Sequence, residues 1–165
     1  MAGRDERALN LLRFLVLFNL FSLPLYFFSQ LNLPLSPLQK HVAGLTGALL
    51  ELAGIDTEVR GNLVAIRTPS GMFAGVINSE CTGAEMMLGF LALCLATKAT
   101  VRKKLKSLLF LPLIYCVNAL RVFFVFFSVC ILGYENFWFI HNVVFGAITV
   151  FAILTMWITW MKWIR

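Results

Sequence analysis

The sequence is poor in charge, and it lacks the local motifs that mark common hydrolases. Charged residues make up 13% of its 165 residues and hydrophobic residues 60%, and the mean hydropathy is +0.85. This composition excludes a soluble domain and indicates an integral membrane protein, which we expect to form a single unit over residues 1–165. There is no Gly-x-Ser-x-Gly nucleophile elbow and no His-Glu-x-x-His metal motif. Serine hydrolases and zincins are therefore poor candidates.

Cysteine is also scarce, and its four positions form neither a disulfide framework nor a zinc-ligand spacing. We therefore predict no metal and no cofactor. Cys94, Cys116 and Cys130 lie inside apolar runs, where cysteine behaves as a small hydrophobe. Cys81 differs because it stands at the border of such a run. The first apolar segment lacks a small-residue cleavage site, so we expect it to be retained as an anchor.

The positions of the basic residues predict the orientation in the membrane. The net charge is +6, but most of the cations gather near the N-terminus, in residues 98–106 and at the C-terminus, a pattern that argues against nucleic-acid binding. Positive charge is enriched on the cytoplasmic side of membrane proteins. We therefore expect a multi-pass protein of the inner (plasma) membrane, with both termini and residues 98–106 in the cytoplasm. The sequence leaves the oligomeric state open.

The long apolar runs predict an all-α integral membrane protein with about four transmembrane helices. A helix needs roughly 20 apolar residues to cross a bilayer. We expect spans at residues 10–29, 82–97, 107–132 and 140–162, with Pro24 kinking the first. The second is short and requires extension or a thinned bilayer. Lipid is thus the expected surrounding of most of the chain.

Residues 30–81 form the one long external segment, and their pattern predicts two structured parts. After a chain break at Pro34 and Pro37, apolar residues recur at helical spacing over residues 38–53, namely Leu38, Val42, Leu45, Leu49 and Leu52. We expect this helix on the outer membrane surface, with a re-entrant placement as the alternative. Two β-prone runs then flank the turn signal at residues 68–71, which predicts a β-hairpin just before Cys81.

In this topology three reactive side chains lie at the outer face: Cys81 before the second span, Arg121 within the third and His141 at the start of the fourth. A thiolate is a strong nucleophile, and a helix N-terminus or a cation lowers the pKa of a thiol. Thr82 and Glu85 have capping-box spacing, which puts the helix start beside Cys81. His141 can exchange a proton near neutral pH, and Arg121 can stabilise an oxyanion. Glu80 opposes thiolate formation.

Other interpretations of the same residues remain open. An arginine within an apolar span costs about 2.5 kcal/mol or more, so Arg121 is either functional or snorkels to an interface. Asn118 lies on the same helix face and can bond Arg121 or a neighbouring helix. A transporter or channel subunit with Arg121 in a polar pathway is the leading alternative, although it leaves Cys81 without a role. Another type of intramembrane protease is a second alternative.

The motifs Cys81-Thr82-Gly83 and Asn118-x-x-Arg121, followed by His141, resemble those of the exosortase/archaeosortase family. These are membrane-embedded cysteine transpeptidases with a Cys-(Ser/Thr)-Gly motif, an Asn-x-x-Arg motif and a later His or Arg. The resemblance covers the chain from about Asn62 to the C-terminus. The chain looks like a short member of the family that keeps only the core of the domain. Threonine stands where serine is commoner, and Glu80 has no place in the family pattern.

The resemblance implies an intramembrane cysteine protease, with Cys81 as nucleophile, Arg121 as stabilising cation and His141 as acid and base. Asn118, Thr82, Gly83 and Glu85 would support them. The implied substrates are exported, membrane-anchored proteins with a C-terminal sorting tail of the PEP-CTERM kind: a short motif, a hydrophobic helix and a basic end. The enzyme would cut near the motif, hold the product as a thioester and pass it to an envelope acceptor. The tail motif and the acceptor stay open.

Overall fold

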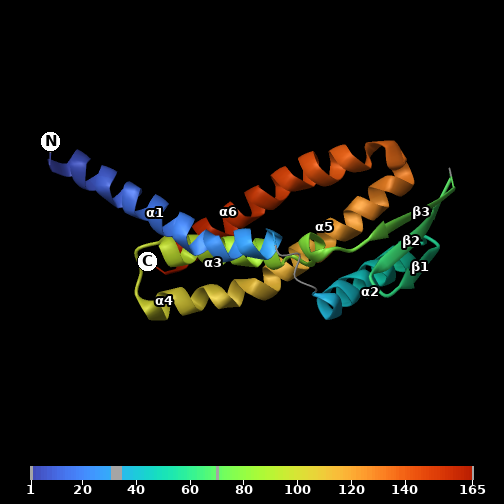
Figure 1. The fold of residues 1–165 in the computed structure, drawn as a ribbon, viewed down its shortest axis with the longest axis horizontal. Helices are drawn as coiled ribbons and strands as arrows, with labels where there is room; N and C mark the ends of the chain where they lie inside the picture. Colours follow the sequence, from blue (N-terminus) through green and yellow to red (C-terminus); the bar gives the residue numbers. More distant parts are fainter. Residues whose placement is uncertain (1, 31–34, 70, 165) are drawn as a thin grey trace.

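The computed structural model describes residues 2–30, 35–69 and 71–164, which form a mostly helical protein with one small sheet (Figure 1). The predicted chain break at Pro34, the turn residue Ser70 and the terminal Arg165 lie outside these ranges. Three helices are long and apolar enough to cross a membrane in this part of the chain, over Glu6–Pro24, Val101–Leu132 and Phe139–Trp163. Together with one shorter apolar helix, they confirm the predicted all-α membrane architecture.

The spanning helices follow the predicted apolar runs, with longer ends. Helix α1 covers Ala2–Gln30 and continues through Pro24. Helix α5 covers Leu111–Leu132, and the short α4 (Val101–Leu105) and a 3₁₀ segment (Lys106–Phe110) precede it. Helix α6 covers Phe145–Trp163 after a π-helical turn at Phe139–Val144.

The second predicted span is shorter in the structure than expected. Helix α3 covers Ala84–Ala96, and its 13 residues rise by about 20 Å, less than the roughly 30 Å of a bilayer core. The α-helix starts two residues later than predicted because Gly83, with φ 81°, caps it in the left-handed region. Residues Ser79–Thr82 form a separate 3₁₀ turn that contains Cys81. Because α3 is short, Cys81 lies beside Asn118 in the first half of α5 and not beside the end of that helix.

The predicted external helix is present as α2, covering Ser36–Leu52, and Pro37 occupies its first turn. Its end is set by Gly54 at φ 80°, where the N–H groups of Gly54 and Ile55 bond the carbonyls of Glu51 and Leu50. This is the Schellman pattern, which a glycine at this position allows.

One side of α2 packs against the rest of the protein. Leu52 is 85% exposed, and the residues that face the protein are Val42, Ala43, Thr46, Gly47 and Leu50. Small residues lie on this side because α2 packs closely on α5 and on the sheet. The leucine periodicity thus identified the helix. Of its five residues, Val42 is buried, Leu38, Leu45 and Leu49 are half-buried and Leu52 is exposed, and the placement of this row on the membrane surface stays a prediction.

The predicted hairpin is confirmed, with one additional strand. Strands β2 (Leu63–Thr68) and β3 (Gly71–Val76) pair antiparallel, and β1 (Thr57–Arg60) pairs antiparallel with the other edge of β2. The extra strand arises because Gly61 turns the chain at φ 65°. The strand order is β1-β2-β3, so β3 lies at an edge of the sheet.

Two hydrophobic cores meet along α5. The first joins α2 and the sheet to the second half of α5 through Leu50, Val64, Ile77 and Phe126, among others. The second joins α3 and α6 to the first half of α5, with Phe90, Ile114 and Trp160 at its centre. In Figure 1 both termini and α4 lie at one end of the molecule, and α2 and the sheet lie at the other. The turn with Cys81 lies between the two cores.

A matched pair of glycines in α2 tests the packing of this helix. A Cβ at Gly47 would collide with Cγ2 of Val59 on β1, whereas a Cβ at Gly44 meets nothing within 4 Å. We expect Gly47→Ala to lower the melting temperature in detergent, because overpacking costs about 1–3 kcal/mol. Gly44→Ala should raise it slightly, since alanine favours a helix over glycine by about 0.5–1 kcal/mol. Equal effects of the two substitutions would contradict the orientation of α2 described above.

Candidate active site

The Cys81 turn is held by polar groups from its own sequence. Asn78 caps the 3₁₀ turn, and its side-chain oxygen accepts a hydrogen bond from the Cys81 N–H at 3.1 Å. The buried Thr82 hydroxyl donates to the Ser79 carbonyl at 2.6 Å and accepts from the Ala84 N–H at 3.4 Å. These bonds satisfy backbone groups that a short turn would otherwise leave open.

Asn118 connects this turn to α5. Its side-chain nitrogen donates to the Cys81 carbonyl at 2.8 Å, and the whole residue is buried. The contact needs a glycine opposite, because a Cβ at Gly83 would lie 2.9 Å from the Asn118 side chain. The sequence predicted that Asn118 bonds either Arg121 or a neighbouring helix. In the structure its side chain bonds the turn that holds Cys81 and not Arg121.

Arg121 lies three residues beyond Asn118 on α5, on the same side of the helix. It lines two cavities, one with Cys81 and His141 and another of about 310 Å³ with Glu80 and Glu85. Its Nε atom is buried and has no hydrogen-bond partner. The guanidinium therefore faces the interior between α3, α5 and α6.

His141 lies in the π-helical turn Phe139–Val144. Its ring stacks on Phe137, with centroids 5.4 Å apart and planes 19° apart. The sequence predicted the start of a regular helix at this position and not the wider turn. π-Helical turns are rare and often occur at functional sites.

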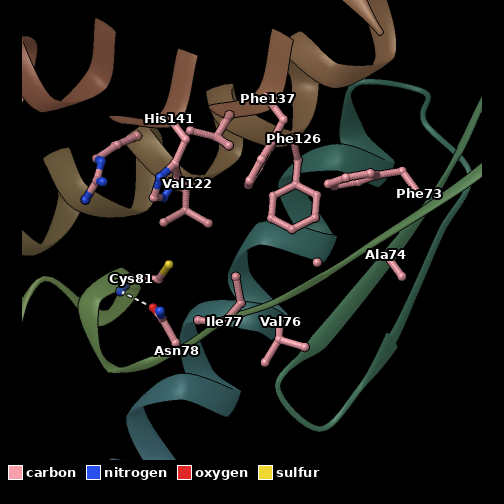
Figure 2. A pocket seen from close by; sticks show the side chains of 13 residues that line it. Phe73, Ala74, Val76, Ile77, Asn78, Cys81, Val122, Phe126, Phe137 and His141 are labelled. Carbon is pink, nitrogen blue, oxygen red and sulfur yellow. Dashed lines mark hydrogen bonds between the residues drawn. The ribbon is translucent and has the colours of Figure 1, made fainter. Parts of the chain in front are cut away.

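The three predicted residues line one cavity of about 350 Å³. Figure 2 shows Val122, Phe126, Phe137 and His141 along one side of it and the end of β3 along the other, with Cys81 between them. The structure thus brings Cys81, Arg121 and His141 together from three separate elements. Asn118, Thr82 and Gly83 support the turn from behind, and Glu85 lies in the first turn of α3 beside the second cavity.

The charge state of the cysteine depends on opposing influences. Burial raises the pKa of the Cys81 thiol above its ordinary value, and the Glu80 and Glu85 carboxylates raise this pKa further. A hydrogen bond with the Asn78 backbone and the charge of Arg121 lower the pKa. Burial has the largest effect, so the resting group is a neutral thiol at neutral pH. In the described chain the thiol forms no hydrogen bond with His141.

Sequence reasoning missed Asn78 and the aromatic wall of the cavity. The signal for Asn78 is its position three residues before Cys81, because Asn side chains commonly bond backbone N–H groups two or three residues ahead. No comparable signal exists for Phe73, Phe126 and Phe137, which come from three elements. Their rings contact each other at centroid distances of 5.5 and 5.9 Å. A thiol, an imidazole and a permanent cation around one apolar cavity are the groups that covalent acyl transfer uses.

Comparison with known proteins agrees with the motifs. Residues 2–159 match the sequence pattern of the transmembrane exosortase family (Exosortase_EpsH), which is nearly the whole chain. Searches of curated proteins and of solved structures found no significant match. Because the family pattern extends over the spans, the sheet and the site together, the chain belongs to the transmembrane exosortase family.

Proposed function

We propose that this membrane protein is a cysteine protease and transpeptidase that removes the C-terminal sorting tail of exported proteins. The observation that carries this proposal is the single cavity lined by Cys81, Arg121 and His141 in a chain of the exosortase family. The substrates would be membrane-anchored proteins whose tail has a short motif, a hydrophobic helix and a basic end. The substrate helix can approach sideways through the bilayer.

The reaction would begin with the neutral thiol. His141 takes the proton from the Cys81 sulfur, and the thiolate attacks the carbonyl carbon of the scissile peptide bond. Arg121 stabilises the oxyanion that forms, because it carries a permanent positive charge and lines the same cavity as Cys81. The C–N bond then breaks, and His141 gives the proton to the leaving amine. An acceptor amine or water then attacks the Cys81 thioester while His141 takes its proton, the C–S bond breaks, and His141 returns the proton to the released thiolate, which restores the neutral thiol.

We also propose an inner-membrane location with residues 98–106 and both termini in the cytoplasm. Basic residues crowd the end of the molecule with α4 and both termini, whereas the opposite end, with α2 and the sheet, has no such excess (Figure 1). Its acidic residues Glu51, Asp56 and Glu58 are balanced by Lys40, Arg60 and Arg67. With residues 98–106 at the cytoplasmic face, α3 raises Cys81 by about 20 Å, two-thirds of the way across a core of about 30 Å. The reacting bond would therefore lie below the outer surface, close to the point where a substrate helix ends.

The nucleophile is tested by substitution of each cysteine. We expect Cys81→Ala and Cys81→Ser to abolish processing of an exported reporter with a motif–helix–basic tail, while membrane abundance stays unchanged. A variant with Cys94, Cys116 and Cys130 all changed to alanine should keep most of its activity. The measurement is the ratio of cut to uncut reporter by immunoblot. An active Cys81→Ala protein would contradict the proposed function.

The role of Arg121 is tested by a substitution that keeps the positive charge and changes the shape of the side chain. A lysine keeps the charge but not the planar fork of donors, so Arg121→Lys should insert normally and lose about 10²–10³ in processing rate. Arg121→Ala should be inserted at least as well as the parent, because a buried charge is removed. Processing and membrane abundance are measured together for both variants. Near-normal processing by Arg121→Lys would support snorkelling, and a parallel loss of abundance would indicate a structural residue.

The pH dependence of thiol alkylation tests both the electrostatics and the orientation. In a variant whose only cysteine is Cys81, iodoacetamide should react faster as external pH rises in intact cells, since only the thiolate reacts and the pKa is raised. Glu80→Gln removes a charge that raises the pKa, so its reaction at a given pH should be faster. Arg121→Gln removes a charge that lowers the pKa, so its reaction should be slower.

The matched control for these charge substitutions is Glu135→Gln, which removes an exposed carboxylate that does not affect the pKa of Cys81. Its alkylation rate should equal that of the parent. The cytoplasm keeps its own pH when the medium changes. A rate that follows pH in broken membranes but ignores external pH in cells would therefore place the site on the cytoplasmic side.

A further inference from the structure

The cavity follows the free edge of β3. The residues of this segment that line it are consecutive, from Phe73 to Asn78, and no residue of β2 takes part. Side chains alternate between the two faces of a strand, so a cavity over one face would contact only every second residue. A cavity that contacts every residue must lie along the edge. Figure 2 shows this edge leading to Cys81.

The register shows which backbone groups are unused. Ile77 directs both of its backbone groups toward Asn62, because its N–H bonds the Asn62 carbonyl at 2.8 Å and its carbonyl accepts from the Asn62 side chain at 3.2 Å. Hydrogen-bonding direction alternates along an antiparallel strand. The N–H and C=O groups of Val76 and Ala74 therefore point away from β2, into the cavity. Both residues are exposed.

The opposite wall would contact the side chains of a bound peptide. A Cβ at Gly75 would lie 2.7 Å from the Phe126 ring, so this ring already closes the face of β3 that looks toward α5. Phe137 extends the same wall toward His141. An extended peptide in the cavity would thus have hydrogen-bonding groups on one side and an apolar surface on the other.

We propose that the edge of β3 binds the substrate segment that precedes the scissile bond, as an added β-strand that leads its carbonyl to Cys81. This inference rests on the proposed function and names how its substrate is held. Binding through main-chain bonds is a known mode of peptide recognition at free sheet edges. β3 runs from Gly71 to Val76 toward the start of α3 (Figure 1). In the proposed orientation, a substrate chain that passes from its exported part into its hydrophobic tail helix runs in the same direction. The added strand is therefore parallel to β3.

The test uses covalent peptide probes and needs no identified substrate. Acetyl-tetraalanine chloromethyl ketone carries its ketone where the scissile carbonyl would lie, and the Cys81 thiolate displaces chloride to form a carbon–sulfur bond. The reference probe is acetyl-alanine chloromethyl ketone, which has the same reactive group and almost no strand. We expect the longer probe to label Cys81 at least tenfold faster in membranes of the Cys81-only protein, as measured by mass spectrometry.

Proline substitutions on the edge identify the bonds responsible. Proline removes an outward N–H and is tolerated on edge strands. Ala74→Pro and Val76→Pro should each slow the longer probe by roughly three- to tenfold, the usual effect of one hydrogen bond, and leave the reference probe unchanged. Met72→Pro is the matched control, because Met72 has the same outward direction but lies outside this cavity. It should have no effect on either probe.

N-methylation of the peptide gives a second test that changes nothing in the protein. Methylation of successive alanines should slow labelling at alternate positions only, since every second amide of a strand faces its partner. Equal labelling by long and short probes, or a loss without alternation, would overturn the strand proposal while Cys81 remains the nucleophile. Failure of both probes to label Cys81 would overturn the proposed function and this inference together.

Discussion

The hydrogen bond from the Asn118 side chain to the Cys81 carbonyl connects the turn that holds the cysteine to the helix that holds the arginine. Such a bond is costly to lose, because the Asn118 side chain is fully buried and would be left without a partner for its N–H groups. Gly83 permits the close approach, since any side chain at its position would meet Asn118. Arg121 follows Asn118 by three residues, so the same bond also brings the guanidinium to the thiol.

The two cores explain why the site lies where it does. Asn118 and Arg121 occupy the part of α5 where the core formed with α3 and α6 ends and the core formed with α2 and the sheet begins. Neither core fills this junction, and two cavities lie beside Arg121. The short helix α3 is part of the same arrangement, because it begins at the junction, directly after the turn that holds Cys81. Packing thus creates a polar space inside an apolar protein.

The charges at this junction act on the Cys81 thiol in both directions, and their sum with burial does not favour the thiolate. Burial and the two glutamates favour the neutral thiol, and Arg121 opposes them. A resting thiol is protected from unwanted alkylation and oxidation, which follow thiolate character. In the proposed reaction the thiolate forms only when His141 accepts the proton, and the same arginine then stabilises the oxyanion. One cation would thus serve both charged species.

The sequence alone determined the apolar spans, the polar external segment and the three candidate residues. These features are local: a run of apolar residues, a turn signal between two β-prone runs, and two short motifs with a later histidine. Periodicity also identified α2, but it did not show that the surface packed on the protein includes the small residues Ala43 and Gly47. Close packing selects size and shape, which a hydrophobic period does not contain.

Only the tertiary structure decided how those residues meet. The sequence did not show that the Asn118 side chain reaches the Cys81 backbone, that His141 lies in a π-helical turn, or that the edge of β3 borders the cavity. The bond between Asn118 and Cys81 joins residues that are 37 positions apart, and the border of the cavity depends on the alternation of backbone bonds across a sheet. Such contacts are set by the sum of packing over the whole chain, whereas a motif records only its own residues.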